Sequence, residues 1–169
     1  MAPIDLKVRR LSPVDAALYR EIRLEGLSAA PEAFGSTFEQ EAAEPIAFFE
    51  ERLEKSHILG AFRGTDIAGT AALGFGTGKR AHIGMLWGMY VRSMARKQGV
   101  GRRLVQSIVD IAREKVEVVQ LVVVSVNAAA LHLYESAGFE LYGLEKKALC
   151  LDGRYYDEIL MALDLTESR

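Results

Sequence analysis

Apolar positions divide the chain into predicted strands and helices. Apolar and polar residues alternate from Ile4 to Val8, which predicts a first strand. Ser12 as N-cap and Pro13 at the first helical position predict a helix that continues to about Leu27. Residues 31–43, in which Phe34 and Phe38 flank a short stretch of small residues, are predicted to form a loop. The early chain therefore predicts one strand, one helix and a connecting loop.

The rest of the pattern alternates between strands and helices. Val118–Val126 is almost wholly apolar and β-branched, which is typical of a strand buried on both faces. Asp152-Gly153 favours a tight hairpin turn. The predicted order is β-αα-βββ-α-β-α-ββ, a mixed α/β fold whose helical crossover makes two central strands parallel. After a second helix at Pro45–Lys55 the predicted elements are strands His57–Arg63, Ile67–Phe75 and His82–Val91, a helix from Val100, strand Val118–Val126, a helix from Asn127 to Gly138, and strands Leu141–Leu151 and Arg154–Leu163.

The stretch Gly88–Val109 joins a strand to a helix through a basic loop. Unpaired N–H groups and the helix dipole make a helix N-terminus attractive to anions. Gly99 and Gly101 carry no side chains that would block an anion from the backbone. Glycines can also merely mark a helix start, and basic runs often face solvent, but the order of strand, charges, glycines and helix favours an anion site. The basic residues are Arg96, Lys97, Arg102 and Arg103.

That loop matches neither common nucleotide-binding pattern. No Gly-Lys-Ser or Gly-Lys-Thr follows its glycines, and the third glycine of the dinucleotide fingerprint is missing. The sequence therefore predicts a site for a phosphorylated ligand at residues 96–102. This site belongs to neither of the two common motifs.

Composition narrows the class of protein. Of 169 residues, 50% are hydrophobic and 26% are charged, which is ordinary for one soluble domain; we expect a domain at residues 1–165 and a tail at 166–169. The net charge of −2 argues against a nucleic-acid binder. Cys150 is the single cysteine, so neither an internal disulfide nor a metal site is expected. Without an apolar run of about 18–20 residues or a signal-peptide core, we expect no membrane span and a cytoplasmic location.

Two blocks of sequence resemble motifs of the GNAT superfamily of acyl-CoA-dependent N-acetyltransferases. One is Arg96-x-x-Gly99-x-Gly101, preceded by a strand that ends in Met89-Tyr90-Val91. The other is Asn127-x-x-Ala130-x-x-Leu133-Tyr134-Glu135-x-x-Gly138-Phe139. The predicted element order matches the family over nearly the whole chain. The sequence departs from the family at Ser93, where many members have proline, and at Lys97, where many have glycine.

The resemblance implies how acetyl-CoA would bind. In the family the parallel central strands splay apart, the pyrophosphate lies on the loop, and the pantetheine arm pairs with the strand before it. The Val91 N–H would stabilise the thioester oxygen as it gains charge, and Tyr134 would protonate the leaving thiolate. The alternative for Tyr134 is a core residue that packs the short helix against the sheet, but its position within Leu133-Tyr134-Glu135 favours the functional role. The cofactor-binding residues implied are Met89, Tyr90, Val91, Arg96, Lys97, Gln98, Gly99, Val100, Gly101, Arg102, Asn127, Ala130 and Tyr134.

An acceptor pocket is implied between the loop that joins the first two helices and the last hairpin. It would have residues 34–36 on one side and residues 155–157 on the other, with Trp87 near the floor. Aromatic and carboxylate groups suit a cationic amine. Because side chains alternate along a strand, at most one of Tyr155 and Tyr156 should face the pocket. The substrate residues expected are Phe34, Trp87, Tyr155 and Glu158.

The sequence thus predicts an N-acetyltransferase that moves an acetyl group from acetyl-CoA to a primary amine by direct attack. The amine would belong to a small molecule, a protein N-terminus or a lysine. The general base is open among Glu158, Glu25, His82 through a water chain, or no side chain. The alternative is a non-catalytic acyl-CoA-binding or regulatory module, against which Tyr134 argues. Dimers are common in the family, and nothing in this sequence requires one.

Overall fold

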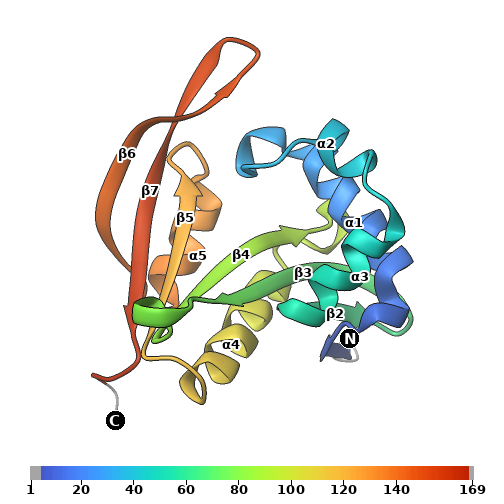
Figure 1. Cartoon of the computed structure of the whole chain (residues 1–169), viewed down its shortest axis with the longest axis horizontal. Coiled ribbons are helices and arrows are strands. Elements are labelled where there is room, and N and C mark those ends of the chain that lie inside the picture. The colour runs from blue at the N-terminus through green and yellow to red at the C-terminus, as the bar shows by residue number, and fades with distance from the viewer. Residues whose placement is uncertain (1–4, 168–169) are drawn as a thin grey trace.

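The computed structural model describes residues 5–167, and over this range the strands form one seven-stranded mixed sheet of order β1-β2-β3-β4-β5-β7-β6 (Figure 1). Ile4, which the alternation assigns to the first strand, lies outside the described residues. The strands are β1 Leu6–Arg10, β2 His57–Arg63, β3 Asp66–Phe75, β4 Ile83–Val91, β5 Val118–Val124, β6 Glu140–Leu151 and β7 Arg154–Asp164. The helices are α1 Ala16–Ala29, α2 Phe38–Ala42, α3 Ile46–Lys55, α4 Val100–Arg113 and α5 Ala128–Ser136.

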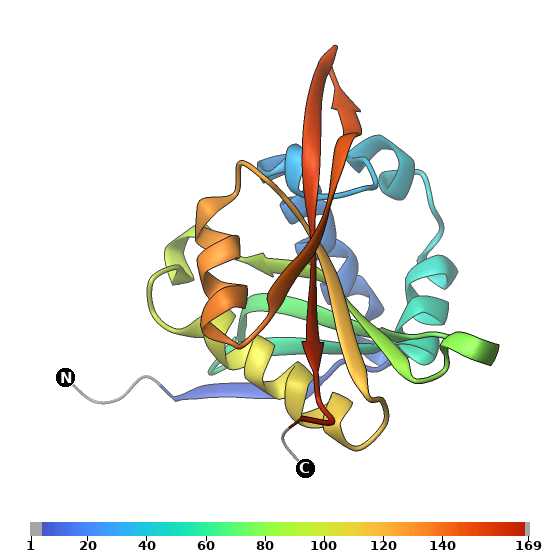
Figure 2. The same cartoon turned by 90° about the vertical axis from the view of Figure 1, so that its left-hand side faces the viewer.

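Helices cover both faces of the sheet, as Figures 1 and 2 show. On one face the apolar stripe of α4, including Leu104 and Ile108, packs into a core with β2–β5 and α5. On the other face α1 and α3 build a second core around Ile22 and Phe49. The β6–β7 hairpin projects beyond the rest of the sheet. The predicted mixed α/β class is confirmed.

The two parallel strands separate after three residue pairs. Residues Ile83–Met85 of β4 pair with Val118–Gln120 of β5, and the pairing stops there. Farther along, β4 pairs only with β3, and β5 only with β7, up to Val124 opposite Glu158. The predicted splay of the central strands is therefore confirmed, and it leaves one edge of β4 without a strand partner (Figure 1).

A bulge at Gly88 determines which backbone N–H groups of β4 point to that free edge. Gly88 has a φ of +63°, and the β3–β4 register shifts at this point. Beyond it, the Arg92 N–H donates to the Ala68 carbonyl of β3 at 2.9 Å. Because N–H groups alternate along a strand, those of Val91 and Met89 point away from β3, toward the gap. The sequence pattern did not indicate this bulge.

The predicted loop at residues 31–43 is wrong in part. It contains a 3-10 turn at Pro31–Ala33 and the short helix α2. The Gln40 N–H donates to Thr37 Oγ1 at 3.1 Å, and the Thr37 N–H donates to Gln40 Oε1 at 3.1 Å. This capping box starts α2 without any apolar periodicity.

The strand predicted to be buried on both faces is half-exposed. β5 ends at Val124, and the side chain of Val122 is 43% exposed. One face of β5 packs against the core beneath α5, while Val122 belongs to the face that no helix covers. The Asp152-Gly153 turn is confirmed, with φ values of +49° and +77° that are typical of a tight hairpin.

Candidate active site

The loop before α4 presents unpaired backbone N–H groups. Gly99 caps α4 with a φ of +82°, and Lys97 adopts a φ of +59° in the position where many family members have glycine. Among the described residues, nothing accepts a hydrogen bond from the N–H groups of residues 97–102. No atom lies within 4 Å of where a Gly99 Cβ would be. The loop is therefore an open cradle for an anion at a helix N-terminus.

Side chains of the loop hold its shape. Arg96 Nε donates to the Val91 carbonyl at 3.1 Å, and Gln98 Nε2 donates to the Met94 carbonyl at 3.0 Å. Val100 is buried, so only its backbone faces the cradle, whereas the Arg102 side chain is exposed. The residues predicted to bind phosphate therefore lie together in the loop. Val100 can offer a ligand only its backbone, whereas Arg102 can also offer its side chain.

Gly101 is the point where α4, α5 and β4 meet. A Cβ at Gly101 would lie 3.2 Å from Leu133 Cδ2 and 3.8 Å from Val91 Cγ2. The same glycine thus lets α5 approach the end of β4, next to the free strand edge. The two sequence blocks, far apart in the chain, are brought together there.

Helix α5 contributes Asn127 and Tyr134. Asn127 Oδ1 accepts a hydrogen bond from the Ala130 N–H at 3.1 Å, which confirms the predicted N-cap and leaves the Asn127 amide nitrogen available. Tyr134 is 5% exposed and packs edge-on against Phe139 at 6.0 Å. Burial raises the pKa of Tyr134, so its phenol keeps its proton throughout the neutral range. Within residues 5–167 no group pairs with the hydroxyl, and it is not a buried unpaired atom, so it keeps contact with solvent.

The three candidate bases differ in their surroundings. Burial, and then the neighbouring carboxylate of Glu145, raise the pKa of Glu158, which lies opposite Val124 where the central strands have separated. Glu25 Oε2 accepts a hydrogen bond from Arg92 Nε at 3.1 Å and is held in an ion pair. His82 is exposed and precedes Ile83, at the end where β4 and β5 are paired. This places His82 about 30 Å from Val91 along the strand, too far for the predicted water chain.

A cavity of about 590 Å³ lies between the loop after α1 and the β6–β7 hairpin. Tyr156 lines it, whereas Tyr155 is 58% exposed and contacts Lys147 instead, as alternation requires. Asp157 does not line it either, since its Oδ1 accepts a hydrogen bond from the Lys147 N–H at 2.8 Å. The remaining lining residues include Leu27, Phe34, Gly35, Ser36, Phe38, Leu149, Cys150 and Leu151.

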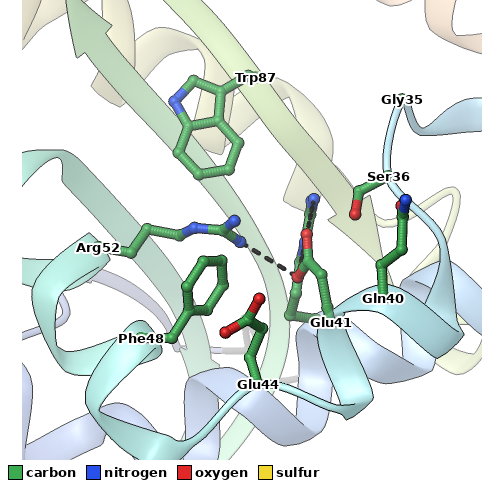
Figure 3. A pocket seen from close by; sticks show the side chains of 9 residues that line it. Gly35, Ser36, Gln40, Glu41, Glu44, Phe48, Arg52 and Trp87 are labelled. Carbon is green, nitrogen blue, oxygen red and sulfur yellow. Dashed lines mark hydrogen bonds and ion pairs between the residues drawn. The ribbon is translucent and has the colours of Figure 1, made fainter.

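Trp87 lines a second cavity of about 520 Å³, between α1, α2, α3 and β4 (Figure 3). Gly35 and Ser36 line both cavities, so the two adjoin there. Phe34, which the sequence analysis placed in one pocket with Trp87, lines the first cavity, and the Arg23 guanidinium carbon lies 5.0 Å from the Phe34 ring and 5.6 Å from the Trp87 ring. The other residues that line the second cavity are Arg23, Gln40, Glu41, Glu44, Phe48 and Arg52.

Beneath Trp87 lies an ionic cluster that the sequence analysis missed. Glu41 accepts hydrogen bonds from Arg23 Nε at 3.0 Å and Nη2 at 2.8 Å, and from Arg52 Nη1 at 3.2 Å. Burial acts to raise the pKa of Glu41, but the hydrogen bonds and charges of both arginines outweigh it and hold the pKa below its usual value. Arg23 falls on the buried helical stripe of Tyr19 and Leu27, and a charge on such a stripe was the available signal.

No group of three or more His, Cys, Asp or Glu side chains within residues 5–167 is arranged to hold a metal ion. Across the same part of the chain, no helix combines the length and the apolar character that a bilayer crossing needs.

Comparison with known proteins agrees with this geometry. The model of the acetyltransferase (GNAT) family matches residues 20–139, which contain β4, the basic loop, α4 and α5. A GNAT acetyltransferase from Streptococcus pneumoniae shares 25% identity, with a TM-score of 0.85 and coverage of 95% of this chain and 99% of that one. No match was found among curated proteins.

Two further solved structures share the fold. The yncA protein of Salmonella typhimurium, solved with acetyl-CoA, has 22% identity and a TM-score of 0.80, covering 95% of this chain and 94% of its own. A ribosomal-protein-alanine N-acetyltransferase from Brucella melitensis has 26% identity and a TM-score of 0.77, covering 94% and 99%. Because the family model covers more than half of the sequence and the fold agrees over nearly its whole length, the chain belongs to the GNAT acetyltransferase family.

Proposed function

We propose that this protein transfers an acetyl group from acetyl-CoA to a primary amine by direct attack. The observation that carries this proposal is the free edge of β4, where the Val91 N–H faces the gap beside the open loop at residues 97–102. A strand edge and an anion cradle in succession suit a ligand with an extended arm and a phosphate group.

The residues present fit acetyl-CoA. Six unpaired N–H groups in the loop and the exposed side chains of Arg96, Lys97 and Arg102 would hold the pyrophosphate. The N–H group of Met89 would hold the pantetheine arm, and the Asn127 amide would donate to it from the other side. Acetyl-CoA, when bound, supplies the activated acetyl thioester.

Three groups of the chain would then support the reaction. The Val91 N–H would donate to the thioester oxygen as its negative charge grows. Tyr134 would hold a proton for the departing sulfur, since its phenol stays neutral and its hydroxyl is unpaired. Glu158 would take the proton of the amine, because its raised pKa lies nearer the working pH of a general base than that of an ordinary carboxylate.

The acceptor would enter through the cavity lined by Phe34 and Tyr156, which adjoins the cavity of Trp87 at Gly35 and Ser36. The two aromatic rings suit an ammonium-bearing ligand before deprotonation. Tyr155 has no place in this proposal, because its ring faces away.

Thiol release from acetyl-CoA, measured across a panel of primary amines, tests the proposal. We expect turnover with at least one amine class and saturable binding of CoA by calorimetry. Binding of CoA without thiol release for any amine, peptide N-terminus or lysine peptide would instead indicate a non-catalytic acyl-CoA-binding module. Failure to bind CoA at all would contradict the cofactor site itself.

A further inference from the structure

In the cavity beneath Trp87, two guanidinium groups surround one buried carboxylate. Glu41 is 3% exposed and lies between Arg23 and Arg52, whose side chains are 9% and 20% exposed. Two guanidinium groups thus share one buried carboxylate. Of the other lining residues, only Glu44 is charged, and it is exposed. The buried cluster has one positive charge in excess.

Both arginines retain donors that Glu41 does not use. Glu41 occupies Nε and Nη2 of Arg23 but only Nη1 of Arg52. The Tyr19 hydroxyl lies beside Arg52 as a further neighbour. Within residues 5–167 neither Arg23 nor Arg52 has a nitrogen that is both buried and unpaired, so the remaining donors keep contact with the water in the cavity. Planar guanidinium groups in this state are the preferred partners of oxyanions.

The cluster lies directly against the free edge of β4. A Cβ at Gly88 would lie 3.5 Å from Arg23 Nη1, and Gly88 precedes Met89, whose N–H faces the gap. The ring of Trp87 lies 5.6 Å from the Arg23 guanidinium carbon and 5.3 Å from that of Arg52. Figure 3 shows Trp87, Arg52 and Phe48 gathered around one space. An anion held there would lie three positions along β4 from Val91, whose N–H is proposed to hold the thioester oxygen.

We propose that this cavity binds the carboxylate of the acceptor, and that the acceptor is an amino acid whose amino and carboxylate groups lie close together. Arg23 and Arg52 would donate to the carboxylate, Trp87 and Phe48 would contact the apolar part, and the amine would face the gap. A volume of about 520 Å³ suits a molecule of this size. The inference rests on the proposed function, because the amine is the group that is acetylated.

Trp87 provides a binding signal that does not depend on turnover. It is the only tryptophan of the chain, so its fluorescence reports on this cavity alone. The CoA-saturated protein is titrated with L-amino acids, with their α-carboxamides, and with aminophosphonates of matching side chain. We expect a saturable change at concentrations about tenfold lower for the carboxylates than for the carboxamides. Equal or better binding of the aminophosphonates would assign the site to phosphonates instead and overturn the carboxylate proposal.

Two substitutions that should change the affinity for carboxylates in opposite directions sharpen the test. Arg52→Gln removes donors and should abolish most of the tenfold preference, whereas Glu44→Gln removes a negative charge at the rim and should strengthen carboxylate binding two- to fivefold. Arg80→Gln is the matched control, since Arg80 is exposed and bonds Gln120 on the β5 side. Because Arg52 also bonds Glu41, circular dichroism checks that its variant is folded; Glu44 has no such contact.

The outcomes separate this inference from the proposed function. Thiol release with equal preference for carboxylates and carboxamides, insensitive to Arg52→Gln and Glu44→Gln, would overturn the carboxylate site and leave acetyl transfer standing. Carboxylate binding that depends on Arg52, without thiol release from any amine, would support the site and overturn the proposed reaction. Absence of any saturable fluorescence change with amino acids would overturn the inference.

Discussion

Trp87 and Tyr90 lie on the same face of β4 although they are three positions apart, an odd spacing. Both pack with the core under α1 and α3, whereas Met89 and Val91 pack with the core under α4. Strict alternation would put Trp87 on the side of Met89. The bulge at Gly88 reverses the alternation, so that one short strand supplies an aromatic ring to a cavity and free N–H groups to the gap.

Gly88→Ala should lower the free energy of unfolding by about 1 kcal/mol, because Gly88 has a φ of +63° that an alanine adopts at a cost. The new Cβ would meet Arg23 Nη1 at an ordinary contact distance, so strain in the backbone is the main effect. Denaturant unfolding measures it. Gly35→Ala is the control, since Gly35 has no positive φ and no atom near its Cβ position. Equal stability of both variants would contradict a strained bulge.

Gly101→Glu should reduce acetyl-CoA affinity at least tenfold. The new carboxylate would repel phosphates at the N-terminus of α4 and would displace Leu133 of α5. Gln106→Glu adds the same charge one turn farther along the exposed side of α4 and should leave affinity nearly unchanged. Calorimetric titration with CoA gives both values. Retained affinity in the folded Gly101 variant would place the phosphates elsewhere.

Tyr134→Phe should lower kcat by about 100-fold and leave the affinity for acetyl-CoA unchanged. The phenylalanine ring keeps the edge contact with Phe139, and no described group loses a hydrogen bond. Thermal unfolding should therefore stay close to that of the wild type. Steady-state thiol release at saturating substrates measures kcat. An unchanged kcat would remove Tyr134 from the proton-donor role and leave it a core residue.

The rate should fall at low pH as Glu158 is protonated. Burial and Glu145 raise the pKa of Glu158, and a general base must be ionised, so activity is lost as pH falls through that raised value. Glu158→Gln should lower the rate and remove this limb of the pH–rate profile. Glu145→Gln should instead move the limb to lower pH, because it removes the negative charge opposite Glu158. A limb that persists in Glu158→Gln would assign it to another group.

Glu41→Gln should lower the free energy of unfolding by about 3 kcal/mol, because it leaves two arginines without their buried carboxylate. The folded pKa of Glu41 lies below its unfolded value, so its contribution is complete above pH ~4.3 and is lost as pH falls through the folded value. The variant should therefore lose less stability on acidification than the wild type. Glu51→Gln, which only breaks a surface pair with Lys55, should change little. Urea unfolding at several pH values measures these differences.

Several parts of the site were readable from the sequence because their signals are local. Gly99 and Gly101 mark the helix start, Asn127 caps α5 through a residue three positions away, and Asp152-Gly153 closes its own hairpin. The capping box of Thr37 is equally local, but apolar periodicity does not reveal it, because it depends on the polar side chains of Thr37 and Gln40.

The sequence by itself determined the family, the order of the elements and the glycine loop before α4, since each follows from residues a few positions apart. Tertiary structure alone decided that Arg23 and Arg52 share Glu41, that Tyr156 and not Tyr155 lines a cavity, and that His82 lies at the wrong end of β4. The physical reason is that ion pairs, cavities and strand registers depend on how separate elements pack. No local pattern of apolar and polar residues encodes those distances.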